Sequence, residues 1–135
     1  MQHLANKVRK SGFVPDYLVG IALGGLIPLA LIAEELDIRT IVTFSAKSYR
    51  GTERGELNIL YKPTVDLHDK KVLLVDEIAD SGTTLYAITD ILQKEYRASE
   101  VRTAVISYNT DKCAQLPDFY IFGDTRWIVF PWEKD

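Results

Sequence analysis

Residues 71–85 constrain the fold of this chain more than any other part of its sequence. Positions 72–75 are four consecutive apolar residues, two of them β-branched, which is typical of a strand buried on both faces. Two adjacent carboxylates, Asp76 and Glu77, follow directly and predict the end of that strand. Gly82 then precedes an apolar pattern of helical period. The segment therefore predicts a buried strand, a tight turn and a helix in direct succession.

The turn between this strand and this helix has the composition of an anion site. A glycine-containing turn at a helix N-terminus presents backbone N–H groups and the positive end of the helix dipole, which suits a phosphate. The alternative is that Asp80 or Ser81 only caps the helix, with Thr83 and Thr84 in its first turn. Because acids, glycine and hydroxyls occur together in this one segment, the sequence favours a site for a phosphorylated ribose.

Strand and helix patterns alternate along most of the chain. The segments with the apolar character of strands are residues 17–23, 40–45, 71–76, 101–107 and 119–122. The segments with helical character are the N-terminal residues around Leu4 and Val8, the stretch after Gly25 through Leu36, and residues 83–96. This alternation predicts an α/β fold with a mostly parallel sheet flanked by helices, in which ligands bind at the carboxyl ends of the strands.

Three short segments are predicted to meet at those strand ends. They are the turn Ala22–Gly25, the acid pair Asp76–Glu77 and residues Tyr108–Lys112. Glycines in the first segment let the backbone approach an anion closely, although a plain strand-to-helix turn explains them equally well. The convergence of the three segments predicts one active site at one edge of the sheet.

Length and composition favour a single domain over residues 1–135. The net charge of −3 argues against nucleic acid or a membrane surface as the main partner. Cys113 is the only cysteine, which excludes an internal disulfide and favours a cytoplasmic location. The N-terminus predicts an amphipathic helix rather than a signal peptide, and the longest apolar stretch, around 26–33, is too short to span a bilayer.

The run VLLVDEIADSGTT, residues 72–84, resembles the phosphoribosyl-pyrophosphate signature of the type I phosphoribosyltransferases. The resemblance implies the fold of that family, with Mg²⁺ as cofactor held by Asp76 and Glu77. It also implies that Asp80 exchanges a proton with N7 of a purine as general acid or base. The residues implied to bind the ribose and its 5-phosphate are Asp76, Glu77, Ala79, Asp80, Ser81, Gly82, Thr83 and Thr84.

The same resemblance assigns pyrophosphate to two further segments. Members of the family often carry Arg or Lys before the Gly-Gly pair of the first turn, where this chain has Leu23. Residues 46–58 are charged and lack an apolar period, so they predict either a solvated surface loop or the mobile lid of the family. The residues implied to contact pyrophosphate are Leu23, Gly24, Gly25, Ser48 and Tyr49.

Residues 123–135 resemble the small C-terminal hood that covers the base in the xanthine–guanine–hypoxanthine branch of the family. In that branch Trp-Ile-x-x-Pro-Trp followed by an acid recurs, and this chain has the same pattern over 127–133. Trp132 is interpreted as a cover for the edge of the core, whereas the flat face of Trp127 suits a planar base. The residues implied to contact the base are Trp127, Ile128 and Asn109.

Two positions depart from that branch. Asn109 stands where a lysine usually donates to the 6-oxo group of the base, and Lys112 is a candidate substitute three residues later. Val129 replaces an acid that faces the 2-substituent. The sequence therefore leaves the identity of the base open.

The resemblance implies transfer of the phosphoribosyl group from phosphoribosyl pyrophosphate to guanine, xanthine or hypoxanthine, a reaction of purine salvage, in a homodimer or homotetramer. Two alternatives stay open. One is a nucleotide-binding regulatory module of the same fold with little turnover, which the absence of a basic residue at Leu23 and Asn109 favours. The other is a transferase for a different base.

Overall fold

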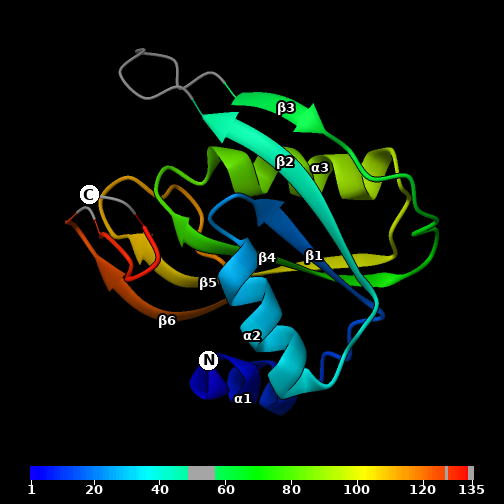
Figure 1. The fold of residues 1–135 in the computed structure, drawn as a ribbon, viewed down its shortest axis with the longest axis horizontal. Coiled ribbons are helices and arrows are strands. Elements are labelled where there is room, and N and C mark those ends of the chain that lie inside the picture. The colour runs from blue at the N-terminus through cyan, green and yellow to red at the C-terminus, as the bar shows by residue number, and fades with distance from the viewer. Residues whose placement is uncertain (49–56, 127, 134–135) are drawn as a thin grey trace.

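The computed structural model describes residues 1–48, 57–126 and 128–133, which form three helices and six strands (Figure 1). In chain order the elements are α1 (Gln2–Ser11), β1 (Tyr17–Ala22), α2 (Leu26–Leu36), β2 (Ile41–Ser48), β3 (Leu57–Tyr61), β4 (Lys71–Ala79), α3 (Thr83–Lys94), β5 (Glu100–Asn109) and β6 (Phe119–Asp124).

All described strands belong to one sheet with the order β3-β2-β1-β4-β5-β6. Strands β2, β1, β4, β5 and β6 run parallel, and β3 pairs antiparallel with β2 at the edge. Helices α1 and α2 pack on one face of the sheet and α3 packs on the other (Figure 1). The predicted α/β fold with a mostly parallel sheet is confirmed.

The apolar run of β4 is buried on both sides, as predicted. Leu73 and Val75 pack with α1 and α2, whereas Val72 and Leu74 pack with α3. All four side chains are fully buried, and each contributes about 1.5–3 kcal/mol through removal from water. This two-sided burial fixes the register of β4, and therefore fixes where the residues that follow Val75 leave the core.

Strand β4 is longer than predicted, because the acid pair does not end it. The strand continues to Ala79, and Ile78 and Ala79 pair with Ser107 and Tyr108 of β5. The two strands continue together past the acid pair, because the backbone hydrogen bonds between them satisfy the polar groups of both. The two acids consequently project from a strand rather than from a loop.

Both ends of the charged segment 46–58 belong to strands. Residues 46–48 belong to β2 and residues 57–58 to β3, with Lys47 opposite Asn58 and Ser48 opposite Leu57. Strand β3 was not predicted, because its five residues lie at an edge, are half-exposed or exposed, and follow a charged stretch. The segment 49–56, with Tyr49, lies outside the described residues, so the lid stays a prediction.

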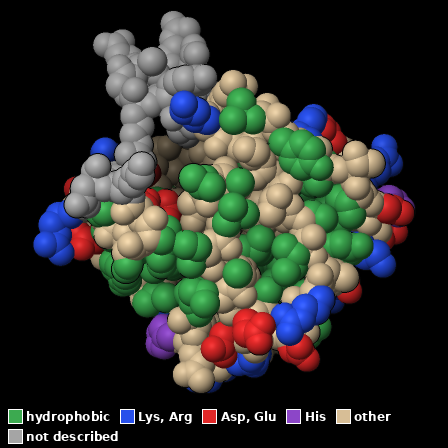
Figure 2. All heavy atoms as spheres, in the orientation of Figure 1, with side chains coloured by type: hydrophobic (Ala, Val, Ile, Leu, Met, Phe, Trp, Pro, Cys, Tyr) green, Lys and Arg blue, Asp and Glu red, His purple; other side chains and the backbone are tan. Residues whose placement is uncertain are grey.

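Helix α2 is apolar on most of its sides. Leu29, Ile32 and Ala33 face the core, whereas Ile27 and Leu31 are more than a third exposed. Figure 2 shows hydrophobic side chains gathered over the middle of the face of the molecule on which α2 lies. Within the described ranges, no helix has the length and hydropathy needed to cross a membrane.

Candidate active site

The turn after β1 packs directly against the acid pair at the end of β4. A Cβ atom on Gly24 would lie 2.4 Å from Oε1 of Glu77, so only a glycine lets the turn and this carboxylate occupy their present positions. A Cβ atom on Gly25 would lie 2.6 Å from the carbonyl oxygen of Ile21 and 2.9 Å from that of Val75. The Ala22–Leu23 peptide bond is cis, and Leu23 is 82% exposed.

The acid pair combines one desolvated carboxyl group and one that contacts the C-terminal segment. Burial, with a further contribution from the charge of Glu77, raises the pKa of Asp76 to about 7, and a hydrogen bond from the Glu77 backbone N–H opposes that shift. That N–H group donates to Oδ1 of Asp76 at 2.8 Å. The Glu77 carboxylate accepts a hydrogen bond from the indole N–H of Trp132 at 3.0 Å.

The raised pKa of Asp76 makes the free energy of unfolding depend on pH. The folded state holds this proton more tightly than the unfolded state, so we expect stability to fall between pH about 4 and 7 and to level off above that. The loss from this group is at most roughly 4 kcal/mol at 1.36 kcal/mol per unit. Urea unfolding without divalent cations should show this slope in the wild type and a flatter one in Asp76→Asn. Equal slopes would contradict the assignment.

The loop between β4 and α3 ends in a glycine that serves as the helix N-cap. Gly82 has φ +88°, a conformation that L side chains rarely adopt, and it provides no capping side chain. Ser81 accepts a long bond of 3.3 Å from the Thr83 backbone N–H and lies 2.9 Å from the Thr83 hydroxyl. Asp80 has a different hydrogen-bonding partner, so it is not the cap that the alternative interpretation requires.

Asp80 lies beside the end of β5. Its Oδ1 accepts a hydrogen bond from the Asn109 side-chain nitrogen at 3.2 Å, and Nζ of Lys112 lies 4.0 Å from its Oδ2. Asn109 is buried and already has protein partners at both ends of its amide. The contact between Asp80 and Asn109 was not predicted from the sequence. A direct contact of Asn109 with a base stays a prediction.

The C-terminal hood reaches back to the acid pair through Trp132. Its ring stacks on Phe130 with centroids 5.1 Å apart and an angle of 8° between the planes. Glu133 accepts a hydrogen bond from the Phe130 backbone N–H at 3.1 Å. Trp132 was predicted to cover the edge of the core, and its bond to Glu77 was not predicted, because the two residues lie 55 positions apart and no local pattern relates them. Ile128 is half-buried, and Trp127 lies outside the described residues.

The predicted site residues therefore lie in one region at the carboxyl edge of the sheet, apart from those outside the described part. Gly24 contacts Glu77, Asp76 is its neighbour, and Asp80 lies against the end of β5. Ala79 is buried beneath the loop that begins at Asp80. Ser48 ends β2, two strands away from β4 in the sheet.

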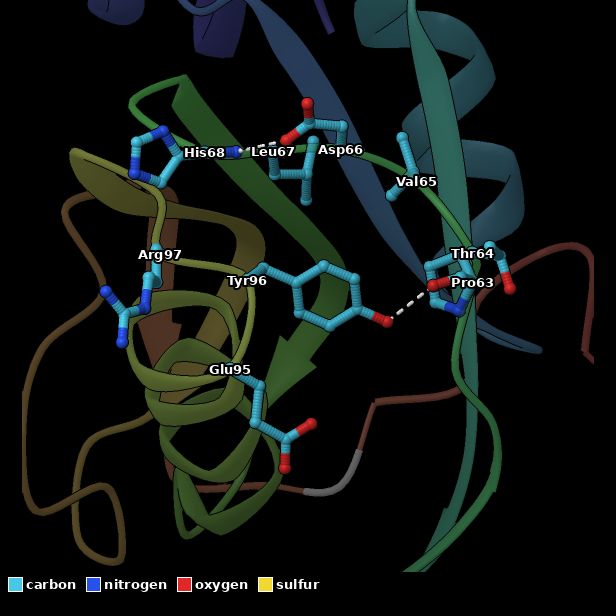
Figure 3. Close-up of a pocket in the computed structure, with 9 residues that line it drawn as sticks. All are labelled: Pro63, Thr64, Val65, Asp66, Leu67, His68, Glu95, Tyr96 and Arg97. Atoms are coloured by element: carbon cyan, nitrogen blue, oxygen red, sulfur yellow. Dashed lines mark hydrogen bonds between the residues drawn. The ribbon is translucent and has the colours of Figure 1, made fainter.

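A hollow of about 490 Å³ at the opposite end of the sheet is separate from this region (Figure 3). The segment that leads into β4 and the residues just after α3 line it, and the Tyr96 hydroxyl donates to the Pro63 carbonyl across it. Lys62 pairs with Glu95 at its margin. None of the predicted site residues that the structure describes lines this hollow.

The donor set of the acid pair fits a magnesium ion that is bound together with a substrate. Across the described ranges, no group of three or more His, Cys, Asp or Glu side chains could hold a metal by itself. Mg²⁺ usually keeps several waters and binds through one or two carboxylates and substrate phosphates, so a complete protein cage is not needed. Asp76 and Glu77 are carboxylates of the kind that such an ion takes, and their role as its ligands stays a prediction.

Comparison with known proteins identifies the family. The family described as Phosphoribosyl transferase domain matches residues 1–134. The chain belongs to this family. The predicted membership, and with it the prediction of an enzyme that transfers phosphoribosyl groups, is confirmed.

Relatives of this phosphoribosyltransferase share most of its length. The xanthine-guanine phosphoribosyltransferase of Cereibacter sphaeroides is 32% identical over 120 residues, which are 86% of this chain and 68% of that protein. The crystal structure of a purine phosphoribosyltransferase from Pyrococcus horikoshii has a TM-score of 0.84 and 34% identity, and the match covers 98% of this chain and 86% of that one. A Neisseria gonorrhoeae protein with bound ppGpp has a TM-score of 0.80 and 25% identity over 98% of this chain and 82% of that one.

Proposed function

We propose that this phosphoribosyltransferase transfers the 5-phosphoribosyl group of phosphoribosyl pyrophosphate to a 6-oxopurine, with release of pyrophosphate. The observation that carries the proposal is the close approach of Gly24 to the Glu77 carboxylate. It joins the turn assigned to pyrophosphate to the acids assigned to the ribose, which are the two parts of one donor. The purine acceptor is supported by the names of the relatives, xanthine-guanine and purine phosphoribosyltransferases.

The donor half of the proposed mechanism uses residues on and after β4. Asp76 and Glu77 bind the ribose hydroxyls, and backbone and hydroxyl groups of residues 80–84 bind the 5-phosphate at the N-terminus of α3. Departure of pyrophosphate leaves positive charge on C1 of the ribose, which the nearby carboxylates stabilise. The family generally uses Mg²⁺ with this donor; Asp76 and Glu77 would hold such an ion, which would supply positive charge to neutralise the pyrophosphate.

The acceptor half uses Asp80 and Lys112. Asp80 exchanges a proton with N7 of the base through Oδ2, the oxygen that Asn109 leaves open. Lys112 lies beside that oxygen, and its ammonium group donates to the 6-oxo group. The 6-amino group of adenine is itself a hydrogen-bond donor and cannot accept a hydrogen bond from the Lys112 ammonium group. Lys112 therefore favours 6-oxopurines over adenine.

Replacement of Lys112 by Met should lower kcat/KM for guanine and hypoxanthine about tenfold, the low end for loss of a hydrogen bond from a charged group, because the side chain is largely exposed. The KM for the donor should not change. Steady-state kinetics with varied base measures both values. Lys94→Met, which removes an exposed ion pair with Asp90 on α3, is the matched control. Equal efficiency in the Lys112 variant would remove this residue from base recognition.

One experiment tests the whole proposal. The protein is given phosphoribosyl pyrophosphate and Mg²⁺ with guanine, xanthine, hypoxanthine or adenine in turn, and pyrophosphate release is measured. Release with a 6-oxopurine is expected.

A regulatory nucleotide-binding module is the second candidate, favoured by Leu23 in the basic position and by the ppGpp bound to the Neisseria gonorrhoeae relative. Binding of ppGpp without pyrophosphate release from any base would favour that module and overturn the enzyme proposal.

The proposal extends to assembly, location and the two segments that complete the site. Ile27 and Leu31 expose apolar surface on α2, and such surfaces mark protein interfaces, so we expect a homodimer or homotetramer in sedimentation measurements. A monomer at micromolar concentration would contradict this.

The single cysteine favours a cytoplasmic location. The lid with Ser48-Tyr49 closes over pyrophosphate, and Trp127 and Ile128 of the hood cover the base.

A further inference from the structure

Two polar residues are buried in the described part of the chain, and they differ in how their side chains are satisfied. Both Ser107 and Asn109 lie near the carboxyl end of β5. The Ser107 hydroxyl has no hydrogen-bonding partner among the described residues, whereas the Asn109 side chain has partners at both ends. Because buried amides are costly unless they are satisfied, the partners of Asn109 determine its orientation.

The two ends of the Asn109 amide bind different parts of the site. Its oxygen accepts hydrogen bonds from the backbone N–H groups of Asp111 and Lys112, both at 2.9 Å. Its nitrogen donates to Oδ1 of Asp80 at 3.2 Å and lies 3.5 Å from the Thr125 carbonyl oxygen. Two N–H donors can be met only by oxygen, so the amide nitrogen is the end that faces Asp80.

This arrangement gives the two oxygens of Asp80 different partners. Asn109 occupies Oδ1, and Oδ2 faces the side on which Lys112 lies at 4.0 Å. A further titratable group that interacts with Asp80 is the Cys113 thiol, on the same connection between β5 and β6 as Lys112. A carboxylate on a short loop would otherwise rotate among several rotamers, and proton transfer depends on its direction.

We propose that Asn109 is a positioning residue for this reaction. It holds the Asp80 carboxylate so that Oδ2 points to the base, and the same amide fixes the turn that carries Lys112. Asn109 thereby joins the proton-exchanging group and the base-recognising group into one unit. The inference rests on the proposed function, because that function gives Asp80 its role in proton transfer.

Asn109→Asp separates the contact with the turn from the contact with Asp80, because aspartate is isosteric with asparagine. It keeps an oxygen for the two backbone N–H groups, but it replaces the donor to Asp80 with a second carboxylate oxygen. We expect kcat to fall about 10–100-fold, as for loss of a hydrogen bond to a charged group, while the KM for phosphoribosyl pyrophosphate stays within about twofold. The pH profile of kcat/KM should also change, because Asn109→Asp places a second carboxylate against Asp80.

The controls distinguish positioning from a purely structural role. In an Asp80→Asn background, Asn109→Asp should change turnover by less than about twofold, since the effect acts through Asp80. Asn6→Asp adds the same charge at an exposed site on α1 and should leave turnover unchanged. Wild-type kcat and an unchanged pH profile in Asn109→Asp would overturn the proposal.

A thermal-unfolding measurement tests the contact without relying on turnover. Asn109→Asp should lower the melting temperature at pH 7 by roughly 3–8 °C, and adding Asp80→Asn should restore it, because an amide again faces a carboxylate. Absence of this coupling would overturn the positioning role. If the wild type releases no pyrophosphate with any base, the proposed function fails. The thermal coupling between Asn109 and Asp80 does not depend on turnover, so its presence or absence still tests their contact.

Discussion

Asp80→Asn should reduce turnover by a factor of about 10²–10⁴, the range that positioned general acid–base groups contribute. The amide is isosteric with the carboxylate, so the loop and its contact with Asn109 can be retained while the ability to exchange a proton at N7 is lost. Binding of phosphoribosyl pyrophosphate should stay within about twofold, because the ribose acids and the α3 N-terminus are unchanged. Single-turnover kinetics and calorimetric titration of the donor measure the two quantities.

A matched variant makes this result specific. Asp90→Asn removes an exposed carboxylate of α3 that pairs with Lys94 at 3.1 Å, so it changes charge by the same amount away from the site. Its turnover should equal that of the wild type. If Asp80→Asn also turned over at the wild-type rate, Asp80 would have no part in proton transfer.

Gly24→Ala should lower kcat/KM for the donor about 10–100-fold, equivalent to roughly 1.4–3 kcal/mol of transition-state stabilisation. The added Cβ would lie 2.4 Å from Oε1 of Glu77, so the carboxylate has to leave its position. That atom is the end of a flexible side chain, and the fold should tolerate its movement. We therefore expect a loss of donor use with a small change in melting temperature, measured by steady-state kinetics and thermal unfolding.

Gly25→Ala is the matched comparison, because its added Cβ meets backbone atoms instead of a side chain. The contacts would be 2.6 Å to the Ile21 oxygen and 2.9 Å to the Val75 oxygen, neither of which can move without shifting a strand. The Gly25 variant should lose stability, whereas the Gly24 variant should lose activity. Unaltered kinetics in Gly24→Ala would show that the position of Glu77 is unimportant for donor use.

Most of the fold could be predicted because each element carries its own local pattern. The parallel strands read as short apolar runs, and α3 shows its buried face as Leu85, Ile88 and Leu92. Strand β3 could not be found in this way, because an edge strand buries little and needs no apolar period. The predicted end of β4 was also wrong. The pairing of Ala79 with Tyr108 depends on the register between two strands, and the two acids give no sign of it.

The sequence by itself determined the donor half of the candidate site, from Asp76 to Thr84. These residues are consecutive, so strand, turn and helix bring them together wherever the segment folds. The tertiary structure alone decided the contacts of Glu77 with Gly24 and with Trp132, and of Asp80 with Asn109. Those partners are 29 to 55 positions apart along the chain, and parallel strands linked by crossover helices bring them to one edge only through the register of the whole sheet.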